Sequence, residues 1–217
     1  MLITFEGIDG SGKSTQVKLL KNYFQAKKID AVVFREPGGI ELSENIRMLL
    51  LQSQQDISAV AELLLFAASR AELVKKLVLP ALEKKQIVIL DRFYDSTTAY
   101  QGYGRGVDLN IIADINRIAS FGLSPSLTFF LDIVPEDAMM RKFSEKSLPL
   151  SFGKHDSPLD RMESSGLDFY HRVRNGYKSL SSEHRGRFVE IDALKSVTEI
   201  HKEIVGRVLA KLNDADK

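Results

Sequence analysis

Residues 7–14 read Gly7-Ile8-Asp9-Gly10-Ser11-Gly12-Lys13-Ser14. They match G-x-x-x-x-G-K-[ST] at every fixed position, a pattern typical of loops whose backbone N–H groups surround nucleotide phosphates. An apolar run, residues 2–5, precedes the loop, and residues 13–28 follow it with apolar side chains at helical spacing. This order predicts a phosphate-binding loop between a strand and the N-terminus of a helix, where the helix dipole also favours anions.

Each part of this loop has an expected role toward a bound nucleotide. Its glycines allow the backbone to approach phosphate oxygens closely. We expect Lys13 to reach the β- and γ-phosphates and Ser14 to ligate magnesium. The alternative is a glycine turn that binds nothing. The expected nucleotide-binding set is Gly7, Ile8, Asp9, Gly10, Ser11, Gly12, Lys13, Ser14 and Thr15.

An acidic residue and an arginine follow a second apolar run. Residues 86–90 are typical of a buried strand and lead into Asp91 and Arg92. A carboxylate at the end of such a strand is expected to hold magnesium, often through water, although it could instead cap the next helix. Arg92 could bridge the donor and acceptor phosphoryl groups. The guanine-reading pattern Asn-Lys-x-Asp is absent from the chain, which disfavours a GTPase switch.

The composition excludes several classes of protein. The 217 residues include 30 Lys and Arg against 29 Asp and Glu, a net charge of +1, which argues against a strongly electrostatic nucleic-acid binder. The absence of cysteine excludes disulfide frameworks and thiolate chemistry. No apolar stretch approaches a membrane span, and residues 1–5 do not resemble a signal peptide. We expect a cytoplasmic protein with no nucleic-acid or membrane partner.

Short apolar runs alternate with helical patterns along the chain. Strands are predicted at residues 2–5, 31–35, 86–90, 127–134 and 187–191, and helices at 13–28, 42–51, 57–79, 107–121, 136–146, 160–182 and 197–212. This alternation predicts an α/β fold, a five-stranded parallel sheet with helices on both faces, in a single domain spanning residues 1–217. Ligands of such sheets bind at the carboxyl ends of the strands.

Five motifs resemble those of thymidylate kinases in order and spacing. They are Phe5-Glu6-Gly7-Ile8-Asp9-Gly10-Ser11-Gly12-Lys13-Ser14-Thr15, Arg35-Glu36-Pro37-Gly38-Gly39, Phe66-Ala67-Ala68-Ser69-Arg70, Asp91-Arg92-Phe93 and Ala99-Tyr100-Gln101-Gly102. The resemblance extends from residue 2 to about residue 212. It implies the P-loop nucleoside monophosphate kinase fold and the reaction of ATP and dTMP to ADP and dTDP, with magnesium as cofactor.

The resemblance implies an acceptor site built from several segments. Phe66 and Arg70 share a helical face, where the ring would stack on a pyrimidine and the guanidinium would donate to a base carbonyl. Tyr100 would crowd the 2′ position of the sugar and reject ribonucleotides. The structural alternatives are core packing for the rings and solvated charges for the arginines. The implied acceptor set is Asp9, Glu36, Pro37, Arg47, Phe66, Arg70, Arg92, Ser96, Thr97, Tyr100 and Gln101.

Further roles are implied for single residues. Asp9 would accept a hydrogen bond from the sugar 3′-hydroxyl, or only shape the loop. Glu36 would lie near that hydroxyl and near the metal, which makes Ser14, Asp91 and Glu36 the implied magnesium set. Arg47 would hold the acceptor phosphate. Asp192 and Ala193, after the last predicted strand, match the loop beside the adenine of ATP.

Residues 142–160 are the expected lid that excludes water during transfer. The segment 148–158 contains two prolines and a glycine, which indicates a mobile loop. By the same resemblance, Arg161, directly after residue 160, would clamp the ATP phosphates and completes the implied catalytic set of Lys13, Arg92, Asp9 and Arg161. Within the family that the chain resembles, Gly10 implies the bacterial-type subgroup whose phosphate loop lacks an arginine.

The helical segment 57–68 is apolar almost all round, apart from Ser58 and Glu62. Such a helix is buried in a core or in an interface, and the resemblance implies a homodimer. Two other functions remain open: a kinase for another pyrimidine nucleoside monophosphate on the same scaffold, and a nucleotide-binding regulatory protein.

Overall fold

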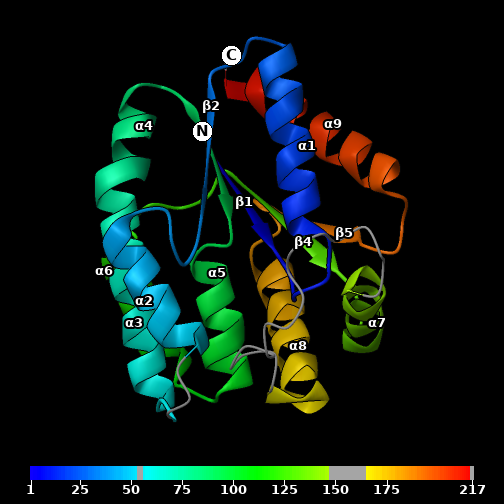
Figure 1. Cartoon of the computed structure of the whole chain (residues 1–217). Helices are drawn as coiled ribbons and strands as arrows, with labels where there is room; N and C mark the ends of the chain where they lie inside the picture. The colour runs from blue at the N-terminus through cyan, green and yellow to red at the C-terminus, as the bar shows by residue number, and fades with distance from the viewer. Residues whose placement is uncertain (53–55, 147–164, 216–217) are drawn as a thin grey trace.

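The computed structural model describes residues 1–52, 56–146 and 165–215. Its centre is a parallel five-stranded sheet in the order β2-β3-β1-β4-β5, with helices on both faces (Figure 1). The strands are β1 Leu2–Glu6, β2 Ala31–Arg35, β3 Ile87–Asp91, β4 Leu127–Asp132 and β5 Phe188–Asp192. The predicted fold class and all five predicted strands are confirmed, with ends that differ by one or two residues.

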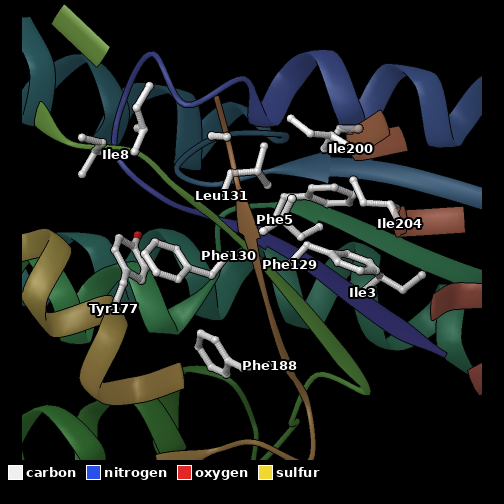
Figure 2. Close-up of a cluster of buried hydrophobic side chains, with 14 of the residues drawn as sticks. Ile3, Phe5, Ile8, Phe129, Phe130, Leu131, Tyr177, Phe188, Ile200 and Ile204 are labelled. Atoms are coloured by element: carbon white, nitrogen blue, oxygen red, sulfur yellow. The ribbon is translucent and has the colours of Figure 1, made fainter. Parts of the chain in front are cut away.

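Both faces of the sheet are apolar. Successive side chains of a strand point to opposite faces, and most residues of these strands are apolar. Ile3 and Phe5 of β1 pack with α1 (Lys13–Ala26) and α9 (Val197–Ala215). Figure 2 shows Phe129 of β4 beside them, together with Ile200 and Ile204 of α9. Each such side chain, removed from water, stabilises the fold by about 1.5–3 kcal/mol.

The opposite face is covered by other helices. Leu2, Val88 and Leu90 pack under η1 (Val74–Val78) and α4 (Leu79–Glu83). Phe130 of β4 stacks on Tyr177 of α8 (Leu167–Glu183), with ring centroids 5.1 Å apart (Figure 2). Layers on both faces explain why the strand sequences are nearly continuous apolar runs rather than alternating ones.

The predicted helix at 57–79 differs from the structure at both ends. It begins as α3 (Ala59–Leu73), continues through the π-helical turn η1 and ends in α4 at Glu83. Ser58 caps the start of α3, because its hydroxyl accepts from the Ala61 N–H at 3.3 Å. Pro80 does not end the helix, because it directly follows the π-helical turn η1 as the second residue of α4 and the chain stays helical to Glu83.

The burial predicted for residues 57–68 is only partly confirmed. Glu62 and Leu63 are fully buried, but Val60 and Leu64 are 54% and 52% exposed. Within the described part of the chain, α3 packs chiefly against α2 (Glu41–Gln52) and α6 (Leu109–Ala119), and Val60 and Leu64 form an apolar stripe that stays exposed. Helix α6 begins two residues after its predicted start because the Asp108 carboxylate caps the N–H groups of Asn110 and Ile111.

The remaining helices surround the carboxyl edge of the sheet. Helix α5 (Tyr94–Thr97) runs on as the π-helical η2 (Thr98–Gly104), and α7 (Pro135–Lys146) follows β4. All five strands end at this edge because they are parallel, which brings segments far apart in sequence together there. None of the helices in the described ranges has the length and apolar character to cross a membrane.

Candidate active site

The phosphate loop connects β1 to α1 and is tightly packed at two glycines. Gly7 and Gly10 have φ of 134° and 83°, in the region that favours glycine. A Cβ on Gly7 would lie 2.6 Å from the Leu131 carbonyl oxygen, and one on Gly10 would lie 2.5 Å from that of Ala138. The backbone of α7 therefore leaves no room for an arginine at position 10, which accounts physically for the glycine found there.

Lys13 closes the loop on itself. Its Nζ donates to the carbonyl oxygens of Gly7 and Ile8 at 3.0 and 2.9 Å. Burial and the nearby Arg92 charge lower the pKa of Lys13 to about 8. The ammonium lines a cavity of about 350 Å³ with Ser14, Thr15 and other loop residues, so it lies where phosphates of a nucleotide would enter.

Three oxygen-bearing side chains lie at the edge of this cavity. The Ser14 hydroxyl donates to Oδ2 of Asp91 at 2.7 Å. Oε2 of Glu36 accepts from Arg70, whereas its Oε1 is buried and has no hydrogen-bond partner among the described residues. Magnesium prefers such oxygen ligands and usually binds through one or two carboxylates plus phosphates and water. The donor set therefore fits magnesium, and the three predicted ligand residues all line this cavity.

Arg92 is the centre of the site. Its φ of 73° is rare for a residue with a side chain and directs the chain sharply after β3. One terminal nitrogen donates to Oδ1 of Asp9 at 2.7 Å, and the other donates to the Gly7 carbonyl oxygen at 2.9 Å and to the Ser96 hydroxyl at 3.1 Å. Although burial favours the protonated form, Arg92 and Lys13 hold the pKa of Asp9 well below its usual range.

A buried network beneath Arg92 was missed by the sequence analysis. Glu6, the last residue of β1, accepts from the Phe93 N–H at 2.8 Å, the Ser96 hydroxyl at 2.6 Å and the Tyr177 hydroxyl at 3.1 Å. Burial and the Asp95 charge raise the pKa of Glu6 to about 7. The only signal in the sequence is an acid directly after an apolar strand, and nothing there indicates its partner Tyr177.

A second cavity of about 260 Å³ adjoins the phosphate-loop cavity. Helix α3 contributes Phe66 and Arg70, α2 contributes Arg47, and α5 with η2 contributes a polar wall. The structure brings together the whole implied acceptor set: Asp9, Glu36, Pro37, Arg47, Phe66, Arg70, Arg92, Ser96, Thr97, Tyr100 and Gln101. Leu51, Phe93 and Lys142 line it as well and were not in that set.

Arg70 is buried and is fixed by three hydrogen bonds, unlike a solvated surface arginine. The guanidinium is 2% exposed and donates to three acceptors: Oε2 of Glu36 at 2.8 Å, Oδ1 of Asn116 at 3.0 Å and the Thr97 hydroxyl at 2.7 Å. The Arg47 guanidinium donates a hydrogen bond of 3.0 Å to the Pro37 carbonyl oxygen. Both cations therefore have defined positions at the cavity wall before any ligand binds.

A third cavity of about 790 Å³ lies on the other side of the loop. Ala193 lines it, and its carbonyl oxygen accepts from the Arg141 guanidinium at 2.8 Å. Asp192, predicted with Ala193, is not among the lining residues of this cavity and instead caps the turn by accepting from the Leu194 N–H at 2.9 Å. Of the expected lid, Lys142 lines both the phosphate-loop and acceptor cavities, whereas residues 147–160 and Arg161 lie outside the described residues.

The three cavities form one row along the carboxyl edge of the sheet. The phosphate-loop cavity shares Gly12 and Thr15 with the third cavity. With the acceptor cavity it shares a larger set: Asp9, Glu36, Arg47, Arg92 and Lys142. A long ligand can therefore lie across the loop from one end while a second phosphorylated ligand meets it from the other.

The parallel sheet, its phosphate loop and a cavity on either side of that loop are the features of a P-loop nucleoside monophosphate kinase. A family model described as Thymidylate kinase matches residues 5–204, and the chain belongs to the thymidylate kinase family. Thymidylate kinase of Chlorobaculum tepidum is 61% identical over 208 residues, which cover 96% of each chain. That of Chlorobaculum parvum is 58% identical over 210 residues, 97% of this chain and 96% of the relative.

The fold agrees with a solved structure of the same family. The crystal structure of thymidylate kinase from Ehrlichia chaffeensis superposes with a TM-score of 0.74 at 36% sequence identity. The superposition covers 96% of this chain and 98% of that chain, so the likeness extends over nearly the whole of both chains.

Proposed function

We propose that the chain transfers the γ-phosphoryl group of ATP to dTMP at the junction of the phosphate-loop and acceptor cavities. As a thymidylate kinase, it is an enzyme that makes dTDP with ATP as phosphate donor. ATP would lie along the phosphate loop toward Ala193, and dTMP would lie between Phe66 and Arg92. The observation that carries this assignment is the set of residues shared by the two cavities, among them Asp9 and Arg92.

The proposed chemistry is a direct in-line transfer. The acceptor oxygen belongs to a phosphate that is already anionic, so no general base is required. Catalysis then consists of placing the two phosphates and stabilising the charge that develops between them. Arg92 is positioned for this role because its guanidinium lies where the cavities meet, and Lys13 supplies a second positive charge from the loop.

Magnesium would be held by Ser14 and Asp91, with Glu36 close by. When bound, the ion neutralises charge on the phosphates of ATP. Burial raises the pKa of Glu36, and the opposing charge of Arg70 counteracts this effect. Arg70 also keeps Oε2 of Glu36 occupied, which leaves Oε1 as its available ligand atom.

The acceptor cavity has the chemistry that a pyrimidine nucleotide needs. Phe66 offers a ring for stacking, and Arg70 retains N–H groups for a base carbonyl. Arg47 and Arg92 offer positive charge to the phosphate, while Tyr100 packs beneath Arg92, with the guanidinium 5.2 Å from the ring centroid. This contact fixes the Tyr100 ring, and we propose that the ring excludes a 2′-hydroxyl.

We also propose that two copies of the chain associate through the apolar stripe of α3. Val60 and Leu64 are one turn apart and about half exposed, and Leu49 on the neighbouring α2 is 56% exposed. An exposed apolar patch of this kind is typical of a protein interface. The proposed location of the enzyme is the cytoplasm, in keeping with a chain that has no cysteine.

The decisive experiment is an acceptor panel with ATP and magnesium, scored by ADP formation. We expect dTMP to be phosphorylated with a higher kcat/KM than dUMP, UMP, CMP or AMP. A higher kcat/KM for another pyrimidine nucleotide would assign the cavity to that acceptor instead. Calorimetry that finds a single nucleotide site per chain would favour a nucleotide-binding regulator.

A further inference from the structure

Glu62 is a fully buried carboxylate that the proposed mechanism does not use. It lies on α3 one helical turn before Phe66 and is not among the lining residues of the acceptor cavity. Its Oε1 accepts a hydrogen bond of 2.7 Å from Nε2 of Gln101 on η2. The Arg105 guanidinium approaches the same oxygen at 3.4 Å and supplies the opposite charge that a buried carboxylate needs.

The hydrogen bond between Glu62 and Gln101 determines which end of the Gln101 amide faces Glu62. A carboxylate only accepts hydrogen bonds, whereas the amide of glutamine has an NH₂ that donates and a carbonyl oxygen that accepts. Glu62 therefore requires the NH₂ end of Gln101, and the carbonyl oxygen Oε1 is left for the cavity that Gln101 lines. Because Gln101 is 1% exposed, turning the amide over would break a buried hydrogen bond without replacement by water.

Arg70 presents the complementary group in the same cavity. A guanidinium has five N–H donors, and Glu36, Asn116 and Thr97 take one each, so two remain. Donors from Arg70 and an acceptor from Gln101 match the 4-carbonyl and the N3–H of thymine. Cytosine carries the reverse pattern, an amino group at C4 and an acceptor at N3.

We propose that Glu62 is a positioning residue that sets the base specificity of the acceptor site by holding the carbonyl oxygen of Gln101 toward the N3–H of the base. This proposal rests on the assignment of the cavity to dTMP. Without an acceptor-only partner, the Gln101 amide can turn over and present its NH₂, which suits the N3 of cytosine. Discrimination of this kind is strong because the wrong base leaves buried polar groups unpaired.

The test compares dTMP with 5-methyl-dCMP, which keeps the methyl group and reverses the hydrogen-bonding pattern at C4 and N3. Glu62→Gln keeps the shape of the side chain but introduces a group that both donates and accepts. We expect the ratio of kcat/KM for dTMP to that for 5-methyl-dCMP to fall by about tenfold or more. The matched control Arg105→Lys keeps a cation beside an intact Glu62 and leaves this ratio at its wild-type value.

A double variant separates positioning from a merely structural role. Glu62→Gln combined with Gln101→Glu exchanges the two groups, so the carboxylate introduced at position 101 can only accept from the base. The preference for dTMP then returns toward the wild-type ratio. An equal loss of kcat/KM with both acceptors in Glu62→Gln, or no recovery in the double variant, overturns the proposal.

If Glu62→Gln does not fold, a crystal structure of the wild-type enzyme with dTMP decides the question. We expect the Gln101 amide to bridge Glu62 and the N3 of thymine. A Gln101 side chain turned away from Glu62, or beyond hydrogen-bond reach of N3, overturns the proposal. Failure of the proposed function is a different result, in which the wild type does not phosphorylate dTMP or binds it outside this cavity.

Discussion

Arg92 and Asp9 form an ion pair of 2.7 Å at the junction of the two cavities in which the phosphates are expected to meet. Asp9 belongs to the phosphate loop and Arg92 follows β3, so the pair joins the two motifs that the sequence places 83 residues apart. A guanidinium held by a loop carboxylate is positioned before substrate binds, which is the condition for electrostatic stabilisation of a transition state.

Arg92→Ala is expected to lower kcat far more than it weakens dTMP binding, because we propose that the guanidinium stabilises charge that develops during transfer. The expected loss in kcat is roughly 100-fold to 1,000-fold. Steady-state kinetics with dTMP varied at saturating ATP measure both effects. Arg117→Ala, which removes a 69%-exposed cation on α6, serves as the control and leaves kcat unchanged. Wild-type turnover in Arg92→Ala would refute the role of Arg92.

The affinity of the free enzyme for ATP is expected to fall as the pH rises through about 8. Burial and the Arg92 charge lower the pKa of Lys13 to that value, and a neutral amine attracts phosphates less than an ammonium does. Calorimetric titration with ATP at several pH values from about 7 to 9.5 measures the change, which we expect to be about tenfold. In Lys13→Arg the guanidinium stays protonated, so the affinity is expected to be flat over this range.

Glu6 is expected to make the stability of the fold depend on pH. Its pKa rises from 4.5 to about 7 on folding, so its contribution is fully present below about 4.5 and is lost as pH rises through about 7. Relative to Glu6→Gln, the wild type therefore loses up to about 3 kcal/mol of unfolding free energy between these values. Urea unfolding of both proteins at pH 5 and pH 8 measures this difference. An equal difference in unfolding free energy between the wild type and Glu6→Gln at both pH values would contradict the expectation.

Leu64→Glu is expected to convert the proposed dimer into monomers, because it places a charge in the apolar stripe of α3. Sedimentation velocity measures the oligomeric state. Leu209→Glu, at a 37%-exposed position on α9, is the matched control and leaves association unchanged. A wild-type chain that sediments as a monomer at micromolar concentration would remove the basis for the dimer.

The strand–loop–helix order around residues 7–14 can be predicted from the sequence because its determinants are local. Glycines at fixed spacing, an apolar strand before them and an amphipathic helix after them depend only on neighbours along the chain. The five strands and their parallel arrangement follow from the same kind of pattern, and Asp91 at the end of β3 was predictable from it. The roles expected of Phe66 and Gln101, in contrast, needed the family resemblance, because an aromatic residue or an amide on a helix has no distinctive pattern.

What the sequence by itself determined is the fold class, the phosphate loop and the segments that supply the site. The tertiary structure alone decided which side chains touch: Tyr177 reaches Glu6 across 171 residues, and Gln101 reaches Glu62 across 39. It also decided that Val60 and Leu64 face outward from a helix that the sequence describes as apolar nearly all round. The physical reason is that hydrogen-bond partners and burial depend on how helices pack around the sheet, whereas periodicity along one segment specifies only which of its faces is apolar.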